Sequence, residues 1–155
     1  MTRDAFIAAY RDLFEHSPWV IERAADAQPF ANLHAGLMHV VAQATPDEQL
    51  ALIRAHPELA GKAAIDRMLT DASTDEQASA GLDRLTPEEF ANFHALNQAY
   101  REKFGFPFII CVRKTNKAGI LAAMEDRLTH DRATEFATAL HEIGEIVRLR
   151  LEPIG

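Results

Sequence analysis

Along most of the chain, apolar residues recur with the period of an amphipathic helix. This pattern, read together with capping residues and prolines, predicts about eight helices. Their expected ranges are residues 4–15, 18–28, 31–43, 46–56, 73–81, 87–104, 118–129 and 132–151. One uncharged segment, residues 106–112, breaks the period and has no partner strand elsewhere in the chain. We therefore predict an all-α fold with a short buried extended segment at about 106–112.

Several helix ends are marked by local chemistry. Thr45-Pro46 and Thr86-Pro87 each place a capping residue before a proline, and two acids follow in the first turn. Ser17-Pro18 has the same form, with Ser17 as the expected cap. Pro57 should end the helix that begins after Thr45, because proline disfavours helical backbone in the residue before it. A turn is expected at Gly61.

Composition narrows the class of protein. A length of 155 residues suits one domain over 1–155, and 48% hydrophobic residues is ordinary for a globular chain. The net charge of −7 argues against binding to nucleic acid or to an anionic membrane. The single cysteine, Cys111, excludes an internal disulfide and a cysteine metal cluster. With no signal peptide or peroxisomal address apparent, a soluble cytoplasmic protein is expected.

Two short motifs could carry acid–base chemistry. His56 ends a helix before a proline, where it could act as a general acid or base or could simply meet the helix dipole. Ser73-Thr74-Asp75-Glu76 has the form of a capping box, which would begin a helix at Ser73 and direct Glu76 to the Ser73 amide. Ser73, Glu76 and Gln77 nevertheless share one helix face and could line a cavity.

The last predicted helix contains two arginines, and the helical period places them on different faces. Arg150 falls within the apolar arc that Phe136, Ile143 and Val147 form, whereas Arg148 falls on the polar side. An arginine in an apolar stripe needs an anion, which could be a ligand or an internal carboxylate. Both alternatives remain open from the sequence.

The segment 106–112 is the first place to expect a pocket. Its backbone is buried among helices, so its amide and carbonyl groups need partners, and a ligand could supply some of them. The chain has no HExxH, CxxC, Gly-rich phosphate loop or nucleophile elbow. Neither a metal nor a nucleotide cofactor is therefore indicated.

Four blocks, taken together, resemble one family. HPELAGKAA, STDEQASAGLDRL, NQAYREKFGFPFIICVR and EIGEIVRLRL occur in this order from His56 onward. They closely resemble 2-oxo-4-hydroxy-4-carboxy-5-ureidoimidazoline (OHCU) decarboxylases, the last enzymes of the route from urate to (S)-allantoin. The resemblance implies an all-helical, cofactor-free enzyme that forms a homodimer and acts on OHCU.

The resemblance also implies roles for individual residues. His56 and Glu76 map to the catalytic residues, and Arg150 maps to the arginine that holds the substrate carboxylate. His56 would move the hydroxyl proton or reprotonate carbon, while Glu76 would fix the imidazole tautomer or hold the ureido nitrogens. The other substrate-binding positions are Pro57, Ser73, Gln77, Phe108, Ile109 and Ile110.

Two other functions compete with this one. A related cofactor-free lyase or hydrolase could act on another ureido or imidazoline acid. Alternatively, the chain could be a non-catalytic helical interaction module. The second alternative predicts that His56, Glu76 and Arg150 lie far apart or pair only with protein groups.

Overall fold

The computed structural model describes residues 1–60 and 70–153, which form eight α-helices, one short 3-10 helix and no β-strand. The all-α prediction is confirmed. The helices are α1 (Arg3–Tyr10), α2 (Trp19–Ala27), α3 (Leu33–Gln43), α4 (Pro46–Arg54), α6 (Asp71–Ser79), α7 (Pro87–Phe104), η1 (Val112–Lys114), α8 (Lys117–Arg127) and α9 (Arg132–Leu151). The turn predicted at Gly61 lies outside the described residues.

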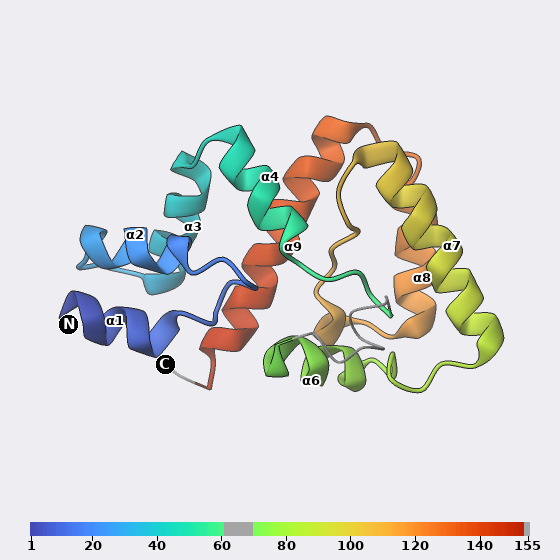
Figure 1. The fold of residues 1–155 in the computed structure, drawn as a ribbon, viewed down its shortest axis with the longest axis horizontal. Coiled ribbons are helices and arrows are strands. Elements are labelled where there is room, and N and C mark those ends of the chain that lie inside the picture. Colours follow the sequence, from blue (N-terminus) through green and yellow to red (C-terminus); the bar gives the residue numbers. More distant parts are fainter. Residues whose placement is uncertain (61–69, 154–155) are drawn as a thin grey trace.

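Helix α9 runs through the middle of the molecule, with α1, α2 and α3 on one side and α6, α7 and α8 on the other (Figure 1). It contacts α3, α4 and α7, and it buries residues along its whole length. Gly144 lets α3 approach closely, because an added Cβ would meet the Met38 side chain at 3.1 Å. The two sides of the molecule are therefore packed against one shared helix.

Local signals placed several helix ends correctly. Thr45 and Thr86 both form complete capping boxes, with Glu48 and Glu89 reaching back to the cap amides. Helix α4 ends at Arg54, just before the His56-Pro57 pair, and α9 has the predicted bounds. These ends depend on contacts within a few residues, which is why the sequence predicts them.

Other helix starts were predicted wrongly. Helix α2 begins at Trp19 with Pro18 in the cap position and no side-chain cap, so Ser17 is not the cap. Helix α6 begins at Asp71 rather than after Ser73, because the hydroxyl of Thr70 accepts from the Ser73 amide at 3.3 Å. The predicted capping box at Ser73 is therefore wrong.

The first helix is shorter than its apolar stripe. Helix α1 ends at Tyr10, and the following turn buries Leu13, Phe14 and Glu15. The turn includes His16, whose φ is +46°. Hydrogen bonds from this turn to distant residues, described below, replace those that a longer helix would have made.

The segment after Gly105 is buried and extended. Phe106 and Phe108 contact Tyr100, with ring centroids 6.0 and 5.3 Å apart. The extended path ends one residue earlier than predicted, since Val112 begins η1. Among the residues placed by the structure, no helix is long and apolar enough to cross a membrane.

Gly105 should be required for its backbone conformation. It closes α7 with φ +80°, and an added Cβ would meet only Arg54 Nη2, at 3.9 Å. Gly105→Ala should therefore lower the free energy of unfolding by about 1 kcal/mol through backbone strain alone. Asparagine tolerates this conformation, so Gly105→Asn should cost less. Urea unfolding measures both, and equal losses would contradict the explanation.

Candidate active site

A small cavity of about 40 Å³ lies where α6, η1, the end of α9 and the two segments 56–59 and 108–111 meet. All nine residues that the sequence analysis proposed for the site line it. They are His56, Pro57, Ser73, Glu76, Gln77, Phe108, Ile109, Ile110 and Arg150. The cavity is also lined by residues that were not proposed, namely Leu59, Cys111, Val112, Arg113 and Ile146.

His56 is held as a neutral base. Its Nδ1 lies 2.9 Å from the Leu52 carbonyl, which can only accept, so Nδ1 carries the proton and Nε2 keeps its lone pair. Burial, the largest effect, and the charge of Arg150 together lower the pKa of His56 to about 4, against the raising effect of the Leu52 hydrogen bond. Leu52, rather than Glu76, therefore fixes the imidazole tautomer.

Arg150 points inward and is surrounded by acceptors. Its Nε and Nη2 donate to the two oxygens of Glu76, at 2.9 and 2.7 Å, in a bidentate pair. Its Nη1 donates to the Leu13 carbonyl at 3.1 Å, and Nη2 also contacts Ser73 Oγ at 3.2 Å. Arg148 instead lies on the outer face and pairs with Glu145. The separation of the two arginines by periodicity is confirmed.

Glu15 is a supporting residue that the sequence analysis missed. This fully buried carboxylate accepts from Thr70 Oγ1 at 2.6 Å and from Ser73 Oγ at 2.7 Å, and it lies 3.6 Å from Arg150 Nη1. Burial raises its pKa, but the two hydroxyl hydrogen bonds and the charge of Arg150 outweigh that effect and leave the pKa below its usual value. Glu15 is thus an anion behind the cavity. Its partners lie more than 50 residues away along the chain, so no local pattern could indicate it.

Two sets of donors belong to residues that line the cavity and have no protein partners in the described ranges. Gln77 accepts from the Ala60 amide through Oε1 at 3.0 Å, and its Nε2 has no such partner. The amides of Phe108, Ile109 and Ile110 also make no hydrogen bond within residues 1–60 and 70–153. These groups are suited to carbonyl or carboxylate oxygens of a ligand.

The site thus combines a neutral base, a carboxylate–guanidinium pair and unpaired amides in a small cavity of an all-helical protein. No three His, Cys, Asp or Glu side chains in the described part of the chain come close enough to share a metal ion. Chemistry without a metal or cofactor remains a prediction.

Comparison with known proteins shows the family of the chain. Residues 1–152 match the OHCU decarboxylase family. The chain is 45% identical to 2-oxo-4-hydroxy-4-carboxy-5-ureidoimidazoline decarboxylase of Haloferax volcanii, over 96% of this chain and 88% of that protein. It is 44% identical to the protein of the same name from Halalkalicoccus jeotgali, over 98% and 86%. The chain belongs to the OHCU decarboxylase family, as the motifs indicated.

A solved structure supports the fold assignment. The crystal structure of (S)-allantoin synthase superposes with a TM-score of 0.76 at 28% sequence identity. The match covers 99% of this chain and 50% of that one. The helical arrangement described above is therefore shared along nearly the whole length of this chain.

The depressed pKa of His56 should make stability depend on pH. Its pKa is about 4 in the folded protein and near 6.5 when exposed, so the unfolded state binds the proton more readily between these values. The free energy of unfolding should fall by about 2 kcal/mol as pH drops from 7 to 4.5, because the folded state resists protonation. Urea unfolding at a series of pH values measures this dependence.

His56→Asn is the matched control for this dependence. The carboxyl groups with lowered pKa, such as Glu15, ordinarily titrate near 4.5, so part of their contribution is already lost at that pH, and it is nearly complete only above about pH 5.5. The window from pH 6.5 to 5.5 therefore separates the effect of His56 from theirs. The free energy of unfolding of the variant should change little with pH in this window. A slope equal to that of the wild type would show that another group is responsible.

Proposed function

We propose that this chain decarboxylates OHCU to (S)-allantoin without a cofactor, as a carbon–carbon lyase. The observation that carries the proposal is that His56, Glu76 and Arg150 converge on one cavity with residues 108–110, which we call the wall of the cavity. The family to which the chain belongs is named for this reaction. The small cavity of this chain and the unpaired donors around it suit a compact, oxygen-rich acid.

The reaction needs control of one bond and one proton. The bond between the hydroxyl-bearing ring carbon and its carboxylate breaks, and carbon dioxide leaves. The electron pair forms a double bond to the neighbouring ureido-bearing carbon, while the pair of the ring C=N bond moves onto nitrogen, which is protonated. The former hydroxyl oxygen, on giving up its proton, carries the enolate charge. A proton then adds to the ureido-bearing carbon from one face, and the oxygen becomes the ring carbonyl of allantoin. The unpaired amides of Phe108, Ile109 and Ile110 are suited to stabilise the oxyanion. His56 Nε2 is the group suited to take up and return a proton.

The Glu76–Arg150 pair bears on how the substrate carboxylate binds. In the described structure Glu76 accepts from two of the five guanidinium N–H donors, Leu13 and Ser73 accept from two more, and Glu15 lies 3.6 Å from Nη1, which carries the remaining donor. A substrate carboxylate must therefore displace Glu76 from at least one donor to reach Arg150. The carboxylate of Glu76, once released, can accept from the ureido N–H groups. Since Leu52 already holds the His56 tautomer, this role is the one left for Glu76.

The alternatives fare differently. A non-catalytic module would keep His56, Glu76 and Arg150 apart or satisfied within the protein. Glu76 and Arg150 do pair with each other, but all three residues line one cavity and His56 Nε2 has no partner in the described residues. A lyase or hydrolase for a related ureido acid would use the same donors. Substrate assays distinguish that alternative, since its preferred acid would react faster than OHCU.

We also propose a cytoplasmic homodimer that binds neither nucleic acid nor membrane. The family resemblance supports the dimer, and the net charge of −7 supports the absence of nucleic acid. Sedimentation velocity on the purified chain measures the oligomeric state directly.

The reaction can be tested by forming OHCU in situ from urate, with urate oxidase and hydroxyisourate hydrolase. The chain should accelerate the appearance of (S)-allantoin, followed by circular dichroism, over the slow racemic decay. His56→Asn should lower kcat about 10²- to 10⁴-fold, because general acid–base catalysis contributes that much. The wild type giving no acceleration over buffer would refute the proposed function.

The role of Arg150 in binding the substrate carboxylate can be tested with two matched substitutions on the same helix. Arg150→Lys should lower kcat/KM about 10- to 100-fold, mainly through KM, because a lysine cannot replace the bidentate fork. Arg148→Lys is the matched control on the same helix, and it should behave like wild type because Arg148 forms only surface ion pairs. Greater damage from Arg148→Lys would show that the wrong arginine was assigned.

A further inference from the structure

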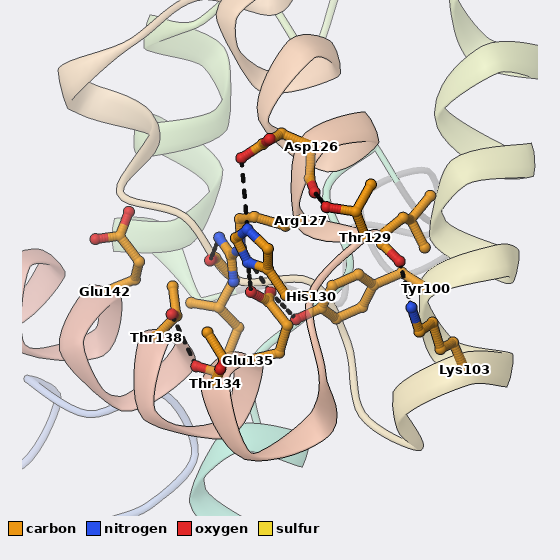
Figure 2. Close-up of polar contacts among 12 residues, drawn as sticks. Tyr100, Lys103, Asp126, Arg127, Thr129, His130, Thr134, Glu135, Thr138 and Glu142 are labelled. Carbon is orange, nitrogen blue, oxygen red and sulfur yellow. Dashed lines mark hydrogen bonds and ion pairs between the residues drawn. The ribbon is translucent and has the colours of Figure 1, made fainter.

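A second buried polar cluster (Figure 2) adjoins residues 108–110 through Arg127. None of its side chains lines the cavity. Its members come from three helices and a loop. They are Tyr100 from α7, Arg127 at the end of α8, His130 from the following loop, and Glu135 from the first turn of α9. We call this group the Glu135 cluster. The proposed reaction assigns it no role.

Glu135 is the fixed anion of the cluster. It is fully buried, and its Oε1 accepts from Tyr100 Oη at 2.6 Å and from Arg127 Nε at 2.7 Å. His130 Nδ1 lies 2.8 Å from Oε2 (Figure 2). Burial raises the pKa of Glu135, but the three hydrogen bonds outweigh it and keep the pKa below its usual value. The carboxylate is therefore charged and locked in one orientation.

Arg127 connects this anion to the pocket wall. Its Nη1 donates to the Ile109 carbonyl at 2.7 Å, and its guanidinium carbon lies 4.2 Å from the centre of the Phe108 ring. Within residues 1–60 and 70–153, this is the one hydrogen bond made by the backbone of residues 108–110. The wall has no partner strand there, so no ladder of hydrogen bonds fixes its peptide planes.

The direction of that bond decides where the next amide points. A trans peptide directs its C=O and N–H to opposite sides. Because the Ile109 carbonyl points at Arg127, which does not line the cavity, the Ile110 N–H points the other way. Ile109 and Ile110 both line the cavity. Arg127 thus sets the orientation of a donor that faces the proposed substrate.

Stability alone does not account for this arrangement. Arginine at the end of a helix ordinarily extends its charge into solvent, whereas the Arg127 side chain is only 8% exposed. Burying an ion pair costs desolvation that apolar side chains of similar volume would avoid. A guanidinium can, however, donate to Glu135 and to Ile109 at once while its plane lies against Phe108. Only the geometry of the wall requires all three contacts.

We propose that Arg127, oriented by Glu135, is a positioning residue that aims the Ile110 amide at the substrate oxyanion. The proposal rests on the proposed decarboxylation. Arg127 touches no reacting atom and acts through the Ile109–Ile110 peptide. Losing it should affect the transition state more than substrate binding, because the oxyanion develops only as carbon dioxide leaves.

Arg127→Lys tests the proposal, since one ammonium cannot satisfy Glu135 and Ile109 in the same geometry. We expect kcat for OHCU to fall about 10- to 100-fold with a smaller change in KM, because a small misplacement of a catalytic group has effects of this size. Glu135→Gln keeps the shape of the side chain and should give a weaker effect of the same kind. It serves as the second variant if Arg127→Lys fails to fold.

Val41→Ala is the control for lost stability. Val41 is buried in α3, on the opposite side of α9 from α8 (Figure 1). The Val41→Ala substitution should lower the melting temperature without changing kcat per folded molecule. If Val41→Ala and Arg127→Lys reduce kcat equally at matched folded fractions, Arg127 is structural only and the proposal is overturned.

Amide NMR separates this proposal from the proposed function. In Arg127→Lys the Ile109 carbonyl and Ile110 amide resonances should shift or split, while those of α3 stay in place. Unchanged resonances at Ile109 and Ile110, or an unchanged kcat, would overturn the positioning role. If the wild type shows no OHCU turnover, the proposed reaction fails, and the NMR comparison still decides whether Arg127 orients the wall.

Discussion

The site depends on one buried arginine near the end of the central helix. Arg150 bonds to Leu13, Ser73 and Glu76, which lie 137, 77 and 74 residues away in the chain. A buried guanidinium is tolerated only if its charge and its donors are satisfied. The turn after α1 and the start of α6 must therefore come to α9, and the cavity forms where they meet.

The same arrangement sets the electrostatics around His56. Glu15 and Glu76 supply two negative charges and Arg150 supplies one positive charge, while burial keeps His56 neutral. Adding another carboxylate to this group is unfavourable unless it takes a donor that Glu76 gives up. Binding of an anion and movement of Glu76 are thus coupled by charge. The coupling favours a ligand that offers N–H groups beside its carboxylate, because those groups give Glu76 new partners.

Local patterns predicted those parts of the site that local physics determines. The caps at Thr45 and Thr86 and the inward face of Arg150 depend on spacing within one helix. For the Ser73–Glu76 motif, the capping box was wrong and the cavity face was right. The two have the same spacing, but Thr70 caps the helix, and Arg150, 74 positions from Glu76, bonds to it at the cavity. Glu15 had no local signal, since its partners come from another helix. The Leu52 carbonyl that orients His56 could not be predicted either, because every residue has a carbonyl and the sequence does not mark which one accepts a hydrogen bond.

Two buried ion pairs, Arg127–Glu135 and Arg150–Glu76, bear on the same cavity. Glu135 lies in the first turn of α9 and Arg150 in its last, so fifteen residues, about 22 Å of helix, separate them. One ion pair orients the wall amides through Arg127, and the other lines the cavity directly. Because both belong to a single rigid helix, their separation cannot change without bending it. The distance between the amide donors and the guanidinium is thereby set by helix geometry rather than by the irregular segment itself. An apolar run with no regular structure can then serve as a precise wall, since the helix behind it supplies the rigidity.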